Sequence, residues 1–189
     1  MASVETTAKT AMMVQFWQAG YGQTTVADLV TASGLSRSQF YRQYHSKAVA
    51  LRQCLQLYQT TLDAQLTQLI ERDRARQTPL FAVLADCLLM PFQSEQWPAG
   101  CLMVNLMAEV GARDAVVAAQ LQTVYTNLQS RLAGLLVPRA NQLPATAAEV
   151  AASLMQVRSG LQLLAKQNPG AAQLKRQAQM SVRLILGEA

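Results

Sequence analysis

The chain has 189 residues, of which 51% are apolar, and its sixteen basic and eleven acidic side chains give a pI near 9.4. Apolar content this high excludes a disordered or low-complexity protein and suffices for a large core. No apolar run approaches the ~18 residues of a membrane-spanning helix. Three widely spaced cysteines do not make a disulfide framework, so we expect a protein of the reducing cytoplasm.

The N-terminal third predicts a helix-turn-helix unit. Residues 25–28 and 36–39 read Thr-Val-Ala-Asp and Ser-Arg-Ser-Gln, which is the spacing of two capping boxes. Each box starts a short helix, one near Val26 and one near Arg37. Gly34 between them supplies the positive φ that a tight corner between two helices requires.

The remainder of the chain predicts a bundle of longer helices. Apolar residues three and four apart mark a long helix after Lys47 and another over residues 117–135, which Pro138 ends. A third capping box, at residues 146–149, starts a further helix, and a last helix follows the Asn-Pro-Gly break at residues 168–170. We therefore expect an all-α protein.

Polar side chains crowd the outer face of the short helix that starts near Arg37. Arginine and glutamine can read base edges, whereas serine, tyrosine and lysine bond phosphate oxygens. Residues 1–60 carry a net charge of +3, which is most of the chain's formal +5. Together with the two caps, this charge favours DNA binding over a helical hairpin whose polar face merely meets solvent.

Residues 16–51 resemble the DNA-binding module of the TetR (tetracycline-repressor) family of bacterial regulators. The matching positions are Phe16, Gly20, Tyr21, Thr24, Thr25, Gly34, Leu35, Ser36, Tyr41, Tyr44, Ser46 and Lys47. The resemblance implies a three-helix DNA-binding domain at residues 1–47 and a helical effector-binding and dimerisation domain at residues 48–189. It also implies contacts to double-stranded operator DNA from Thr25, Ser36, Arg37, Ser38, Gln39, Tyr41, Arg42 and Lys47.

Large, adaptable apolar side chains, rich in methionine, are concentrated between residues 58 and 125. Few charges accompany them, so we expect a pocket for an apolar or weakly polar effector, with plain core packing as the competing interpretation. The pool includes Phe81, Phe92 and Met103. The predicted effector-binding residues are Tyr58, Met90, Trp97, Cys101, Asn105, Met107, Glu109 and Tyr125.

Gly100 is expected to start a helix, which places the Cys101 thiol at a helix N-terminus, where the dipole favours a thiolate. The Gly-Cys-Leu segment resembles a TetR subgroup that regulates electrophile-detoxifying reductases, in some of which the matching cysteine senses electrophiles. Lys166 extends the same resemblance. Inert packing of a buried cysteine is the alternative.

The last two helices, roughly residues 147–167 and 171–187, are the homodimerisation pair by the same resemblance, although their apolar faces could instead bury within one subunit. An enzyme is not expected, because His45 is the sole histidine and no metal, cofactor or catalytic motif is evident. The predicted function is a one-component regulator, a repressor released from a palindromic operator by a small apolar or electrophilic effector. The alternative is a helical DNA-binding architectural or adaptor protein without effector switching.

Overall fold

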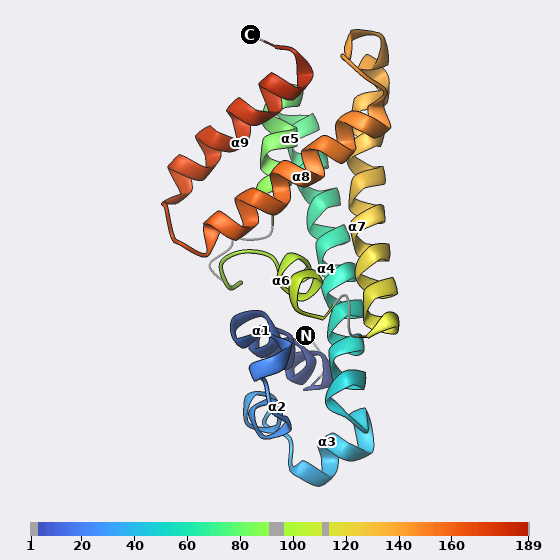
Figure 1. The fold of residues 1–189 in the computed structure, drawn as a ribbon, viewed down its shortest axis with the longest axis vertical. Coiled ribbons are helices and arrows are strands. Elements are labelled where there is room, and N and C mark those ends of the chain that lie inside the picture. The colour runs from blue at the N-terminus through green and yellow to red at the C-terminus, as the bar shows by residue number, and fades with distance from the viewer. Residues whose placement is uncertain (1–3, 91–96, 111–113, 189) are drawn as a thin grey trace. The chain divides into compact units, whose positions relative to one another are not determined.

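The computed structural model describes residues 4–90, 97–110 and 114–188, and the elements in this part of the chain are all helical (Figure 1). The predicted all-α fold is confirmed. In chain order the elements are α1 (Val4–Gln23), α2 (Val26–Ser33), α3 (Arg37–Tyr44), α4 (Lys47–Ala75), α5 (Leu80–Leu89), α6 (Leu102–Glu109), α7 (Ala115–Leu136), the 3-10 helix η1 (Val137–Gln142), α8 (Ala147–Ala165) and α9 (Ala171–Leu186).

The chain divides into two compact units. The first consists of Met1–Thr61 and Asn105–Thr123, and the second of Leu62–Val104 and Val124–Ala189. Because α4, α6 and α7 are continuous helices, each contributes residues to both units. The predicted boundary at residue 47 divides a DNA-binding domain from an effector-binding and dimerisation domain, and this functional division stays a prediction.

Both short helices of the first unit begin at the predicted capping boxes. The Thr25 hydroxyl accepts from the Asp28 N–H at 3.2 Å, and the Asp28 carboxylate accepts from the Thr25 N–H at 2.8 Å. Hydrogen bonds from the Thr25 hydroxyl and N–H hold the pKa of Asp28 below its usual value. Ser36 and Gln39 form the same reciprocal pair at the start of α3. Gly34 ends α2 with φ 69°, the left-handed conformation that the sequence predicted.

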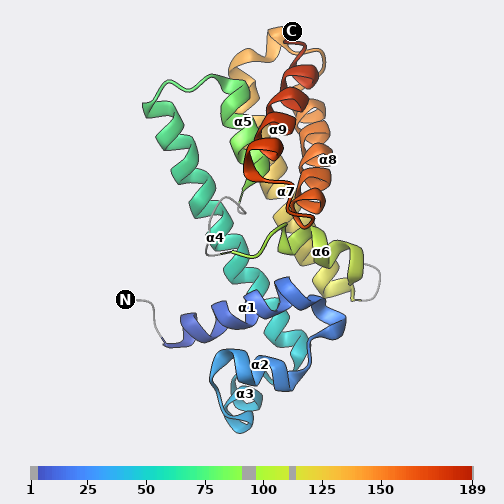
Figure 2. The same cartoon turned by 90° about the vertical axis from the view of Figure 1, so that its left-hand side faces the viewer.

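Aromatic side chains form the core beneath this corner. Phe40 and Tyr44, one turn apart on α3, are both fully buried, with their ring centroids 5.5 Å apart. Trp17 of α1 packs edge-on against Tyr58 of α4, again at 5.5 Å. Figure 2 shows α2 and α3 beside each other next to α1. These contacts leave the opposite face of α3 uncovered.

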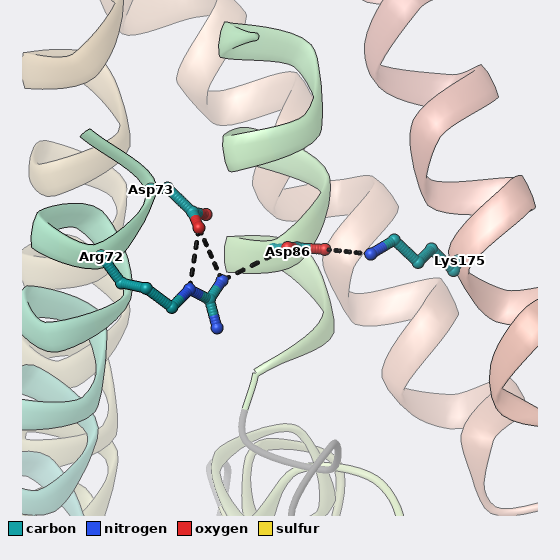
Figure 3. A network of polar contacts seen from close by, with 4 residues as sticks. All are labelled: Arg72, Asp73, Asp86 and Lys175. Carbon is teal, nitrogen blue, oxygen red and sulfur yellow. Dashed lines mark hydrogen bonds and ion pairs between the residues drawn. The ribbon is translucent and has the colours of Figure 1, made fainter. Parts of the chain in front are cut away.

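In the second unit, α5, α8 and α9 pack against one another (Figure 2). A charged network ties α9 to α5 and to the end of α4 (Figure 3). Arg72 contacts Asp73 at 2.8 Å and Asp86 at 3.5 Å, and Lys175 contacts Asp86 at 3.4 Å. Both carboxylates are buried while both cations are about half exposed, so the network pairs two buried acids with cations at the surface.

The predicted long helices are present with small shifts in register. The apolar stripe of α4 is buried as expected, from Leu51 to Leu69. On α7 the buried stripe runs from Val117 to Leu136, one residue beyond the predicted range of 117–135, and Leu135 itself is only partly buried. α7 ends before Pro138, as predicted.

Candidate DNA-binding face and effector region

The outer face of α3 presents the side chains that the sequence assigned to DNA. Because Phe40 and Tyr44 point into the core, the residues between and before them face outward. Ser36, Arg37, Ser38, Gln39, Tyr41 and Arg42 are all exposed. The Arg37 guanidinium lies 5.9 Å from the Tyr41 ring centroid, so the two side chains form one cation–aromatic surface.

Gln39 has a local role besides any contact with DNA. Its carboxamide oxygen accepts from the Ser36 N–H at 2.7 Å, and its own N–H donates to the Ser36 hydroxyl at 3.2 Å. The oxygen is thus committed to the cap. A base contact by Gln39 in this conformation falls to its NH₂ group, so the bidentate reading of a base by this residue would require the cap to open.

Thr25 and Lys47 stand at the N-termini of α2 and α4, as the resemblance implied. The Lys47 ammonium donates to the carbonyl oxygens of Tyr21 and Thr24, both at 2.9 Å, and lies 4.2 Å from the Tyr21 ring centroid. Two of its three N–H donors therefore hold residues 20–24, where α1 loses its helical course and the chain turns into α2. This segment is called the turn between α1 and α2. The third donor of Lys47 is left for a phosphate at the N-terminus of α4, where the Val49 N–H already donates to the Ser46 hydroxyl at 3.2 Å.

The same turn binds Glu109, which the sequence assigned to effector binding. Its carboxylate accepts from the backbone N–H groups of Tyr21, at 2.8 Å, and Gly22. One turn earlier on α6, the Asn105 amide donates to the Trp17 carbonyl at 3.4 Å. Sequence reasoning missed this role, although glycines on both sides of Tyr21 signalled that something approaches the backbone closely there.

The predicted effector residues fall in both compact units rather than in one. Tyr58, Asn105, Met107 and Glu109 belong to the first unit, and Met90, Trp97, Cys101 and Tyr125 to the second. Met107 is 39% exposed, whereas Tyr58 is buried under Trp17. Phe92, another member of the apolar pool, lies outside the described residues.

Cys101 is fully buried directly before α6, the position that the sequence predicted. The buried Arg158 of α8 donates to the Cys101 sulfur at 3.5 Å and to the Met90 carbonyl at 2.6 Å. Gln162, one turn on, donates to the same carbonyl at 2.8 Å. The stem of Lys166 packs beside Gly100, where an added Cβ would lie 3.0 Å from the Lys166 Cγ. The buried thiol therefore lies against a buried guanidinium.

Arg158 itself was not singled out from the sequence. The signal that could have found it is an arginine among the buried apolar positions of α8, between Leu154 and Leu161. The other two cysteines have no such neighbour within hydrogen-bonding distance among the contacts described. Burial raises the pKa of Cys54 and of Cys87 to about 12 each, so both thiols are inert at neutral pH.

A cavity of about 440 Å³ lies in the second unit, around the turn between α8 and α9. Its volume lies within the range of small-molecule sites. Small apolar side chains dominate its walls, with Asn168 and Lys175 as polar members, and none of the predicted effector residues lines it. The lining residues are Leu89, Ala99, Ala165, Asn168, Pro169, Gly170, Ala171, Ala172, Leu174 and Lys175.

The described residues contain no cluster of three or more histidine, cysteine, aspartate or glutamate side chains able to hold a metal ion. In the same part of the chain, no helix is both long enough and apolar enough to cross a membrane. The geometry thus defines an all-helical protein with a helix-turn-helix whose two helices, α2 and α3, both begin at capping boxes. The second of these helices, α3, has an exposed polar face.

Comparisons with known proteins agree with this class. Residues 10–53 match the family described as bacterial regulatory proteins, tetR family. The HTH-type transcriptional repressor ComR of Escherichia coli (strain K12) is 35% identical over 97 residues, which cover 49% of this chain and 44% of ComR. The match thus spans less than half of that repressor.

Solved structures share the fold over nearly the whole chain. A cysteine mutant of the TetR family transcriptional regulator CifR, complexed with 26bp double-strand operator DNA, has a TM-score of 0.77 at 20% identity, covering 94% of this chain and 95% of CifR. The reduced form of E. coli NemR has a TM-score of 0.75 at 18% identity, with 96% of each chain covered. SCO4454 of Streptomyces coelicolor reaches 0.80 at 14% identity, covering 97% of this chain and 94% of SCO4454. The family match is confined to residues 10–53, and the solved structures show that the chain as a whole shares their fold.

Proposed function

We propose that this protein is a one-component transcriptional repressor that binds double-stranded operator DNA as a homodimer and is released from it by a small effector. The observation that carries the proposal is the exposed polar face of α3, which lies within residues 10–53, the segment that matches the tetR family. A helix that served packing alone would not need six exposed hydrogen-bonding side chains around two buried aromatic residues.

In this proposal the face of α3 divides its contacts by chemistry. Arg37, Ser38 and Gln39, at the N-terminal end of the helix, reach base edges in the major groove. Tyr41 and Lys47 bind phosphate oxygens. Lys47 lies at the N-terminus of α4, which attracts anions. Ser36, Arg42 and Thr25 complete the contacts to the DNA backbone.

The homodimer is proposed to form through α8 and α9, which carry large apolar side chains that the subunit does not bury. Leu163 and Leu164 on α8 are 60% and 41% exposed, and Met180 and Leu184 on α9 are 61% and 73% exposed. Two such helix pairs can combine as a four-helix bundle. A two-fold dimer presents two α3 helices about 34–36 Å apart, which calls for a palindromic operator.

The effector is proposed to be a small apolar molecule or an electrophile. The apolar cavity at the turn between α8 and α9 supports the first choice. The contact between Cys101 and Arg158 supports the second, and with it membership of the electrophile-sensing subgroup, because a guanidinium stabilises the thiolate that attacks electrophiles. Lys166, packed beside Gly100, belongs to the same region.

Fluorescence anisotropy on labelled DNA from upstream of the protein's own gene, with and without N-ethylmaleimide, tests this proposal. The Cys101 thiolate would add to the maleimide double bond, forming an S–C bond while the neighbouring carbon takes up a proton. We expect the reagent to release wild-type protein from DNA but not Cys101→Ser, with Cys87→Ser behaving as wild type. Release of Cys101→Ser to the same extent would refute the thiol sensor.

Three further outcomes of this experiment, repeated with unreactive apolar compounds, separate the alternatives. Release by an unreactive apolar compound alone keeps the repressor and moves the sensor to the cavity. Specific binding that neither the reagent nor any compound changes supports the architectural or adaptor protein instead, and the absence of specific binding contradicts the regulator altogether.

A further inference from the structure

We propose that Glu109 is a positioning residue for operator recognition: its carboxylate holds the turn from which α2 and α3 extend. The inference rests on the proposed DNA-binding function and adds to it the residue that orients the DNA-binding corner. All the contacts involved lie within the first compact unit.

The turn between α1 and α2 is shaped to receive one carboxylate. Gly20 has φ 81° and ψ 166°, which breaks the helical course of α1 and frees the next two backbone N–H groups. These N–H groups, of Tyr21 and Gly22, converge on the two oxygens of Glu109. Consecutive N–H groups aimed at one anion form a nest. An added Cβ at Gly20 or at Gly22 would lie 2.8 Å from a Glu109 oxygen, so the close approach requires both glycines.

The turn is held with opposite polarity from its other side. Lys47, the first residue of α4, donates to the carbonyl oxygens of Tyr21 and Thr24, and the buried Thr24 hydroxyl donates to the Gly20 carbonyl at 2.6 Å. Glu109 thus binds donors of the turn while Lys47 binds its acceptors. The next residue is Thr25, the N-cap of α2, so the turn sets where the helix-turn-helix begins.

Glu109 is not placed for the benefit of its own helix. It is the last residue of α6, and the helix dipole disfavours a carboxylate at a C-terminus. Asn105, four residues earlier, also reaches α1 through the Trp17 carbonyl. Two side chains on one face of α6 therefore hold the end of α1.

The local fold and the orientation of the DNA-binding corner have separate causes. The capping boxes at Thr25 and Ser36 and the core around Phe40 hold the corner through contacts that do not involve Glu109. The carboxylate of Glu109 instead fixes the turn between α1 and α2, which leads into the DNA-binding corner. A dimer reads a palindrome only when both corners are held at a fixed separation, so loss of this contact should loosen the spacing requirement rather than abolish DNA binding.

The test measures the affinity of the full-length wild-type protein and of Glu109→Gln for three duplexes. The first is the operator obtained by selecting binding sites from random-sequence DNA, and the other two are the same operator with one or two base pairs inserted at its centre. The amide keeps the size of the side chain but loses the charge, and its NH₂ group cannot accept from the nest. We expect Glu109→Gln to bind the unaltered operator about tenfold more weakly while discriminating less than wild type between the three spacings. Affinity for random-sequence DNA and its salt dependence should stay unchanged.

Gly22→Ala provides an independent variant, because its added methyl group displaces the carboxylate without removing the charge, and it should loosen the spacing requirement in the same way. Glu149→Gln is the matched control, since it alters a carboxylate that accepts a backbone N–H in the second unit, and it should keep the spacing preference of wild type. Unchanged spacing discrimination in both Glu109→Gln and Gly22→Ala would overturn the inference. The inference would also be overturned if the variants lost affinity for random-sequence DNA as much as for the operator, because that result indicates general unfolding. Failure of wild-type protein to bind any specific sequence would contradict the proposed function instead.

Discussion

The exposed apolar residues of α8 and α9 allow the strength of the proposed dimer to be tested with one substitution. Leu184 is 73% exposed in the subunit, so replacing it by alanine should leave the monomer intact. The change removes three carbon atoms, each worth about 0.8 kcal/mol when buried. Multiplied by the exposed fraction of Leu184 and counted once in each subunit, the lost burial is roughly 3.5 kcal/mol per dimer, or on the order of several hundredfold in dimer Kd.

Sedimentation velocity over a range of concentrations measures this Kd directly. Val116→Ala is the matched control, because Val116 is 57% exposed but lies on α7, outside the proposed interface. We expect Leu184→Ala to dissociate at far higher concentrations than wild type and Val116→Ala to dimerise normally. A dimer Kd for Leu184→Ala within threefold of wild type would show that α9 does not form the interface.

Three further predictions concern helix capping, DNA reading and the buried thiols. Thr146→Ala removes the N-cap of α8 and should lower the free energy of unfolding by about 1 kcal/mol in urea, and an unchanged midpoint would contradict the cap. Arg37→Ala should alter sequence preference in a binding selection, whereas Tyr41→Phe should weaken binding to all sequences alike, and the reverse pattern would contradict their proposed roles. Cys54 and Cys87, with pKa values of about 12, should resist iodoacetamide in folded protein at pH 8, as read by mass spectrometry. Because the unfolded chain loses these protons at lower pH than the folded one, their burial should also make stability fall as pH rises from about 9 towards 12.

Features that depend on neighbours in the sequence were predictable. The boxes that begin with Thr25, Ser36 and Thr146 each consist of a hydroxyl residue and a carboxylate or carboxamide three positions on, and all three start helices where expected. The apolar stripe of α4 was predictable for the same reason, since helical periodicity is local. The exposure of Arg37 was predictable because the aromatic residues of the same helix, Phe40 and Tyr44, lie on the opposite, buried face.

Contacts between distant parts of the chain were not predictable from those signals. Glu109 binds backbone N–H groups 87 and 88 residues away, and a backbone donor carries no residue type that could indicate a partner. Arg158 meets Cys101 across 57 residues, and its charge alone suggested solvent rather than a buried thiol. Lys47 was placed correctly at a helix N-terminus, but its bonds to the turn between α1 and α2 depend on how α4 packs.

The central claim is that α3 reads a two-fold symmetric DNA sequence, and selection of binding sites from random-sequence duplex DNA tests it most directly. The account predicts enrichment of a palindrome whose half-sites lie about one helical turn apart, or a multiple of that distance, at moderate salt. It also predicts that Arg37→Ala enriches a different half-site. Binding that decreases with salt but enriches no sequence would contradict the account, because it would show that the basic side chains of residues 1–60 contact phosphates without reading a sequence.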